Sequence, residues 1–306
     1  MQRGRADVLS RRSRSVRDNN KAGKNVGVVR GDEVQVTTEA KTRRPWIVRG
    51  VNSLAGAAMF AAPLLALVAV WAVVVPLFQI NPRVFPSVGA VGTAALESIR
   101  DGTLIAHIGA SLLRVGLGTL IGIVTAVPLG IAMGVSAGVA AFLTPLFRFF
   151  SVLAGIAWIP IATLWFGYGF GAIVFVIFNA VFFVVAYNTL LGVKTIPHTL
   201  RNAAASLGAG RWAVLTEVLL PGALPNIVTG IRTGLGFAWR GLIAAEMIAT
   251  NVGLGYMLFV ARDFYRTEVI VFGMIVIGVL WLLIDRLVLV PLERSTIERW
   301  GMVRRA

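Results

Sequence analysis

The sequence predicts an all-α membrane protein with six transmembrane helices and both termini in the cytoplasm. Its 306 residues are 57% hydrophobic and only 14% charged, whereas an ordinary soluble domain is about 25% charged. The mean hydropathy is +0.80. Six apolar stretches are long enough for a bilayer core, which needs about 20 residues per helix. Composition and span length therefore agree on a polytopic membrane protein.

The six predicted spans follow one another within residues 51–306, the predicted transmembrane domain. The second span is long and is expected to tilt or to extend beyond the membrane. The third is short and carries Pro160, which is expected to kink its helix. The spans are expected near 57–78, 108–135, 149–165, 171–192, 225–250 and 268–290.

Glycines recur at intervals of four residues within these spans. Small residues at this spacing let membrane helices pack closely. Close packing is the simpler interpretation, and sliding of the helices during gating is the alternative. The pairs are Gly118/Gly122, Gly130/Gly134 and Gly230/Gly234.

The distribution of Lys and Arg predicts the orientation. With the N-terminus inside, the inner segments carry 21 of them: 13 in the first 50 residues, Arg148, three in 193–224 and four after the last span. The outer segments carry 4, namely Arg83, Arg100, Arg262 and Arg266. Without the N-terminal segment the ratio is still 8 to 4. Both termini and segment 193–224 are therefore expected on the cytoplasmic side.

The first 50 residues form a basic segment without apolar periodicity. They hold 13 Lys/Arg against 5 Asp/Glu, which is +8 of the net charge of +15. This composition predicts a disordered cytoplasmic tail, and the first long apolar run begins too late for a secretory signal peptide. Because so much of the charge lies in the tail of a membrane protein, it does not indicate nucleic-acid binding. Contact with anionic lipid is the alternative to a solvated extension.

The residue types that support catalysis or metal binding are nearly absent. The chain has no cysteine and two histidines, which excludes disulfides and Cys-ligated zinc and makes a metal site unexpected. "GVSAG" (134–138) matches the G-x-S-x-G nucleophile motif, but that motif needs a strand–turn–helix corner, and here it ends a predicted membrane helix. No G-x-x-x-x-G-K-[ST] sequence occurs, so the chain has no P-loop for ATP. The chain is expected to be neither an enzyme nor a carrier of its own cofactor.

Segment 193–224 interrupts the series of spans with a helix–turn–helix pattern, here called the elbow. Gly208 and Gly210 allow the first helix to end in a left-handed turn, and Pro221 is expected to end the second. The first helix carries one apolar stripe at helical spacing, namely Leu200, Ala203, Ala204 and Leu207. The expected result is a compact elbow, held against the membrane domain, with a small, blunt tip.

The elbow resembles the EAA loop in the permease subunits of binding-protein-dependent ABC importers. That pattern is Glu-Ala-Ala, three residues, Gly, nine residues and Ile-x-Leu-Pro. Here Asn202-Ala203-Ala204 precedes Gly208 and Val218-Leu219-Leu220-Pro221 with both spacings intact, while Asn202 replaces Glu and Val218 replaces Ile. The resemblance implies that the elbow is a coupling helix that docks on a separate cytoplasmic ATPase. The residues that it implicates are Asn202, Ala203, Ala204, Leu207, Gly208, Arg211, Leu220 and Pro221.

Further segments resemble the nitrate/sulfonate/taurine/bicarbonate permeases, and the resemblance covers about 55–300. They are "NPRVFPSVGAV" (81–91), "HIGASLLRVGLGTLIG" (107–122), "AAEMIATNVGLGYML" (244–258) and "VIGVLWLLIDRL" (276–287). The resemblance implies the MetI-like permease fold of type I ABC importers, in the cytoplasmic membrane, importing a small anion or zwitterion. It also implies ATPase subunits that hold ATP and Mg²⁺, an extracytoplasmic binding protein and a second, identical permease copy. It leaves the solute open.

Charged residues within membrane spans are costly and are functional candidates by default. Arg240 and Glu246 are six residues apart, on different faces of a helix, so a direct pair between them is not expected. The candidates for the translocation path are Arg240, Glu246 and Arg114. Structural pairing or snorkelling is the alternative, preferred for Arg114 and Arg232, and Asp285–Arg286 is expected to anchor the last span at the membrane interface.

Two other classes of protein remain as alternatives. An ion-coupled secondary transporter or channel often shows inverted repeats, but no convincing repeat occurs here and the elbow would have no role. A membrane enzyme ranks third, because the chain lacks cysteine, a histidine cluster and a usable nucleophile motif.

Overall fold

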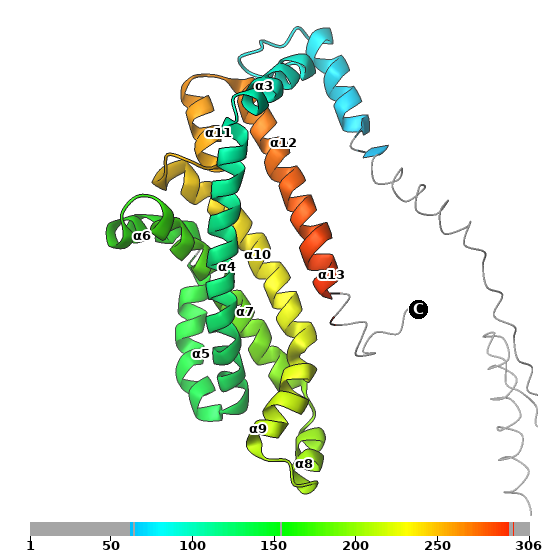
Figure 1. Cartoon of the computed structure of the whole chain (residues 1–306), viewed down its shortest axis with the longest axis vertical. Coiled ribbons are helices and arrows are strands. Elements are labelled where there is room, and N and C mark those ends of the chain that lie inside the picture. The colour runs from blue at the N-terminus through cyan, green and yellow to red at the C-terminus, as the bar shows by residue number, and fades with distance from the viewer. Residues whose placement is uncertain (1–61, 64, 154, 294–295, 297–306) are drawn as a thin grey trace, which may run out of the picture. The chain divides into compact units, whose positions relative to one another are not determined.

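The computed structural model describes residues 62–63, 65–153, 155–293 and 296, so the predicted tail 1–50 lies outside the described residues. All regular structure in this described part is helical (Figure 1). An apolar helix, Leu65–Leu77, precedes the labelled ones. The labelled helices are α3 (Val88–Arg100), α4 (Thr103–Val135), α5 (Ala137–Val152), α6 (Ile159–Phe166), α7 (Phe170–Thr195), α8 (His198–Ser206), α9 (Arg211–Ala213), α10 (Leu220–Ala249), α11 (Leu254–Asp263), α12 (Thr267–Ile284) and α13 (Val290–Glu293).

Within the described part, four helices are long and apolar enough to cross a membrane, or five if one bent pair counts as a single span. The four are Thr103–Val135, Phe170–Thr195, Arg211–Ala249 and Thr267–Glu293. Each overlaps a predicted span. Of the first predicted span, 57–78, the described helix covers Leu65–Leu77. That span and the orientation of the termini stay predictions.

The third predicted span, 149–165, is not one helix. α5 ends at Val152, and the pair Ala137–Val152 and Gly155–Phe166 is bent by 91°. Pro160, expected to kink the span, instead lies in the first turn of α6. Proline is tolerated there because the N–H that it lacks has no helical partner in a first turn. Arg148, counted above in an inner loop, lies within α5.

α7 is the central helix and packs along both α4 and α10. The glycine repeats of α4 face it. A Cβ added to Gly118 would lie 2.6 Å from Cγ2 of Ile177, and one added to Gly130 would lie 2.6 Å from the Ala186 carbonyl oxygen. The structure therefore confirms the close-packing interpretation of these repeats.

Gly130→Val is expected to lower the free energy of unfolding by about 1–3 kcal/mol or more, because the side chain must force α4 away from the α7 backbone. Gly116→Val on the same helix is the matched control, since a Cβ there meets nothing within 4 Å. Thermal unfolding of the two purified variants in detergent measures the difference. Equal losses for both would contradict the packing argument.

The first half of the elbow forms as predicted. Gly208 has φ +85° and is the second residue after α8. The Ala209 N–H donates to the Ala204 carbonyl at 3.0 Å, and the Gly208 N–H donates to the Ala205 carbonyl at 3.0 Å. This left-handed turn satisfies carbonyls at the end of α8 that would otherwise lack partners.

The second half differs from the prediction at Pro221. This proline does not end a helix, because one continuous helix runs over Arg211–Ala249. A π-helical turn, Val214–Leu219, precedes it and places Pro221 in the first turn of α10. A π turn is wider than an α turn, which relieves the clash between a proline ring and the carbonyl four residues earlier.

Most of the expected apolar stripe of the first elbow helix is exposed, and only Ala204 is half-buried. Leu200 is 55% exposed and Leu207 is 89% exposed, and Ala203 is exposed as well. A short helix held by its flanking helices does not need to bury its own apolar stripe, so these side chains remain available to a partner.

Candidate functional site

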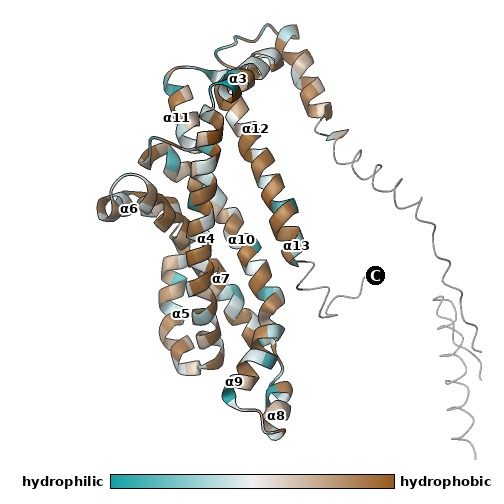
Figure 2. Ribbon diagram, in the orientation of Figure 1, coloured by the Kyte–Doolittle hydropathy of each residue, from teal (hydrophilic) through white to brown (hydrophobic). Residues whose placement is uncertain are grey.

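The elbow presents most of the predicted coupling residues on its surface. The exposed ones are Asn202, Ala203, Leu207, Gly208 and Arg211, while Ala204, Leu220 and Pro221 are half-buried. Trp212, which the prediction of coupling residues omitted, is 75% exposed. In Figure 2 the elbow lies beyond the ends of α7 and α10, with apolar and polar residues intermixed. A large exposed apolar group at a compact tip is suited to a pocket on another protein.

The base of the elbow is packed firmly into the membrane helices. Val193 and Ile196 at the end of α7 bury themselves against Ala223 and Ile227 of α10. A Cβ added to Gly222 would lie 2.9 Å from Cδ1 of Ile196. Because interiors packed this tightly transmit displacement, a movement of the tip would be carried into α7 and α10.

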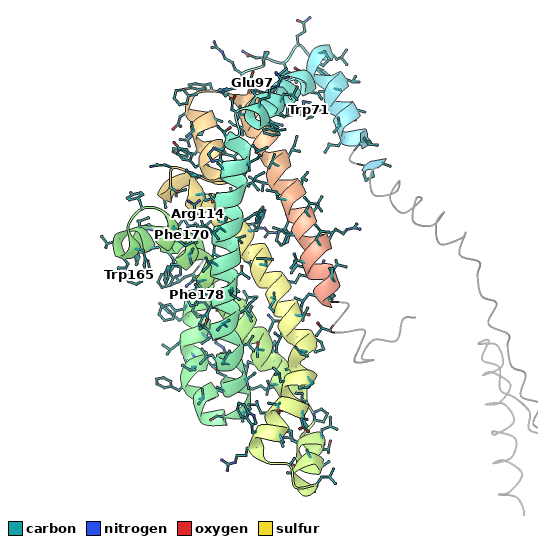
Figure 3. All side chains as sticks on the ribbon, viewed as in Figure 1. Trp71, Glu97, Arg114, Trp165, Phe170 and Phe178 are labelled. Carbon is teal, nitrogen blue, oxygen red and sulfur yellow. The ribbon has the colours of Figure 1, made fainter. Side chains whose placement is uncertain are left out.

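Arg114 and Glu246, two candidates for the translocation path, form a buried ion pair. Arg114 Nη1 lies 2.7 Å from Glu246 Oε1, with the side chains 7% and 0% exposed; Figure 3 labels Arg114 on α4. Ser111 Oγ donates to the carboxylate at 2.8 Å and the Gly255 N–H at 3.0 Å. These four residues, here called the Glu246 cluster, tie α4, α10 and α11 together. The geometry therefore favours structural pairing of Arg114 and Glu246 over a place on the translocation path.

The segment after α10 folds directly onto this cluster. Arg114 donates to the Val252 carbonyl at 2.6 Å and to Thr250 Oγ1 at 2.9 Å. Gly253 has φ +143°, and a Cβ there would lie 2.5 Å from Glu246 Oε1. Only glycine permits both this backbone conformation and this approach. The sequence offered no signal for these contacts.

Arg240, the third candidate, is separated from Glu246 as expected and lines a cavity of about 610 Å³. This cavity, here called the central cavity, lies between α5, α7 and α10 and the 3₁₀ turn Gly155–Trp158. Its polar lining residues are Thr144, Arg148, Ser151, Asn179, Tyr187, Asn188 and Arg240. Two of these residues were not among the predicted candidates: Arg148 was expected in a loop, and Asn179 is an amide within a strongly apolar span.

The remaining candidates have structural roles. Arg232 lies 2.9 Å from Asp285 and 2.6 Å from Glu293. These two ion pairs join α10 to the turns that follow α12. Ser136, the serine of the G-x-S-x-G match, caps α5 by accepting a hydrogen bond from the Val139 N–H at 3.4 Å. In the described part of the chain, no three His, Asp or Glu side chains gather closely enough to hold a metal ion.

Known proteins share both the sequence and the fold. Residues 118–290 match the family described as binding-protein-dependent transport system inner membrane component. The taurine transport system permease protein TauC of Escherichia coli is 38% identical over 227 residues, which cover 72% of this chain and 82% of TauC. The bicarbonate transport system permease protein CmpB of Synechococcus elongatus is 36% identical over 192 residues, 62% of this chain and 67% of CmpB. A solved inward-facing structure of the MetNI methionine ABC transporter has a TM-score of 0.57 at 20% identity, covering 64% of this chain and 97% of the solved one.

The packed membrane helices with a projecting elbow have the fold of the chain in the inward-facing MetNI structure. The chain belongs to the family of binding-protein-dependent transport system inner membrane components. The family and the fold implied by the sequence resemblance are therefore confirmed. The protein is therefore a multi-pass membrane protein, and its relatives TauC and CmpB are permease proteins of transport systems.

Proposed function

We propose that this permease moves a small anionic or zwitterionic solute, of the nitrate, sulfonate or taurine kind, into the cell as part of an ATP-driven importer. TauC and CmpB belong by name to taurine and bicarbonate transport systems, which supports a small solute of this kind. ATP and Mg²⁺ bind to a separate ATPase subunit. An extracytoplasmic binding protein delivers the solute, and a second copy of the chain completes the pathway by two-fold symmetry.

The observation that carries the proposal is the exposed Leu207 on an elbow whose base is packed into α7 and α10. Both helices also line the central cavity. A pull on the tip would shift the two helices together, and rigid-body movement of this kind exchanges one access state for another. The elbow therefore connects an ATPase in the cytoplasm with a cavity between the membrane helices.

Leu207→Asp is expected to weaken binding of the ATPase subunit by about 30-fold, because burying a leucine contributes about 2 kcal/mol and 1.4 kcal/mol corresponds to a factor of ten. The measurement is binding of the purified ATPase to the permease in nanodiscs. Val84→Asp is the control, since Val84 is 75% exposed in the segment after Leu65–Leu77, predicted to lie outside.

ATP-driven uptake into proteoliposomes should fall in parallel with binding. Unchanged binding by Leu207→Asp would contradict the coupling role of the elbow. Uptake by the permease alone, driven by an ion gradient, would instead favour the secondary-transporter alternative.

A further inference from the structure

The central cavity lies near the middle of the membrane-spanning helices. Asn179 is nine residues after the start of α7, and Arg240 is nine residues before the end of α10. At 1.5 Å per residue each is about 14 Å from its helix end, and a hydrocarbon core is about 30 Å thick. Asn179 and Arg240 therefore lie well inside their helices, away from both helix ends.

Arg148 and Arg240, both exposed in the single chain, differ from Arg114 and Arg232. Arg114 and Arg232 are each held by carboxylates at 2.6–2.9 Å. By contrast, the guanidinium groups of Arg148 and Arg240 form no hydrogen bond or ion pair with any other described residue. Charged groups within membrane helices are costly and usually face a partner or a water-filled pathway. Two of them facing one cavity provide the positive potential that an anion requires.

Asn179 provides a second, independent observation. Its residue is only 6% exposed, it lines the cavity, and its amide has no hydrogen-bond partner among the described residues. Buried polar groups are nearly always hydrogen-bonded. Asn188, nine residues further along α7 and also lining the cavity, instead donates its Nδ2 to the Val184 carbonyl at 2.8 Å. Asn179 is therefore free to donate to a ligand in the cavity.

The rest of the lining limits the ligand further. None of the described residues that line the cavity is Asp or Glu, so an ammonium group would find two like charges and no carboxylate. The remaining wall is largely apolar and includes Phe147, Phe183 and Phe237. At about 610 Å³ the cavity falls in the range typical of organic ligands rather than of a bare inorganic ion.

We propose that the central cavity is an anion-binding site of the permease itself, where Arg148, Arg240 and Asn179 hold a sulfonate head and the phenylalanines contact a short alkyl chain. This inference rests on the proposed transport function and narrows its solute class. The site selects alkanesulfonates and disfavours zwitterions such as taurine. The permease thus adds a second selection step after the extracytoplasmic binding protein.

The test is calorimetric titration of the full chain, assembled with its ATPase subunits in nanodiscs, with butane-1-sulfonate or with taurine. Butane-1-sulfonate is expected to bind at least tenfold more tightly than taurine. Arg148→Gln and Arg240→Gln should each weaken butane-1-sulfonate binding at least tenfold. Arg100→Gln, at the exposed end of α3, is the control and should leave binding unchanged.

Asn179→Asp is the second variant, because it keeps the size of the side chain and replaces the donor by a negative charge. It should abolish butane-1-sulfonate binding while the thermal unfolding temperature and ATPase activity stay near those of the unchanged protein. Binding that is insensitive to all three cavity substitutions, or equal affinity for taurine, would overturn the proposed site. ATP-driven uptake measured on the same assembly distinguishes the proposed transport function from the proposed anion site. Normal uptake without detectable binding in the central cavity would refute only the anion site.

Discussion

Replacing Glu246 by alanine is expected to lower the free energy of unfolding by about 3–5 kcal/mol, the range for removing one partner of a buried ion pair. The substitution leaves the Arg114 guanidinium charged in a site where its side chain is 7% exposed. It also removes the acceptor for Ser111 Oγ and for the Gly255 N–H. Circular dichroism of the purified chain during titration with denaturing detergent measures the change.

Two comparisons test the physical reason for that loss. Replacing Arg114 and Glu246 together by alanine should lower the free energy of unfolding by clearly less than the sum of the two single substitutions. Each single substitution leaves one buried charge without a partner, whereas the double substitution leaves none. Asp263→Ala, which breaks the exposed Arg262–Asp263 pair with side chains 60% and 49% exposed, should cost about 0–1 kcal/mol. Additive losses in the double variant would show that Arg114 and Glu246 are not coupled.

The features that the sequence predicted well are those encoded within a short stretch of chain. A long run of apolar residues specifies a membrane helix by itself, and long apolar helices occupy four of the expected positions. The turn at Gly208 was predictable for the same reason, because a left-handed helix end depends on one glycine. Close contacts along α4 followed from the spacing of Gly118, Gly122, Gly130 and Gly134.

The features that could not be predicted depend on distant residues or on a local geometry without a sequence signature. Glu246 and Arg114 are 132 residues apart, and nothing near either one identifies its partner. The bend after Val152 lies in continuous apolar sequence, so residues 149–165 resembled one span and Arg148 a loop residue. The π turn before Pro221 turned an expected helix end into the start of α10.

A substitution in the elbow is expected to have a second large effect, this time on transport. Gly208→Pro is expected to reduce ATP-driven uptake at least tenfold, since proline requires φ near −65° and Gly208 has φ +85°. Proline also removes the N–H that donates to the Ala205 carbonyl. The tip would turn away from its present direction. The membrane helices should remain folded, because nothing lies within 4 Å of a Cβ at Gly208. Uptake into proteoliposomes that contain the permease, its ATPase and the binding protein is the measurement.

Gly210→Pro is the matched control for this substitution. Gly210 has φ −68°, which proline adopts without strain, and a Cβ there also meets nothing within 4 Å. The same residue type is thus introduced two positions apart, and only one position requires a left-handed backbone. If the direction of the tip couples the ATPase to α7 and α10, uptake should fall with Gly208→Pro and persist with Gly210→Pro. Full uptake with both variants would mean that the ATPase drives the permease through another surface.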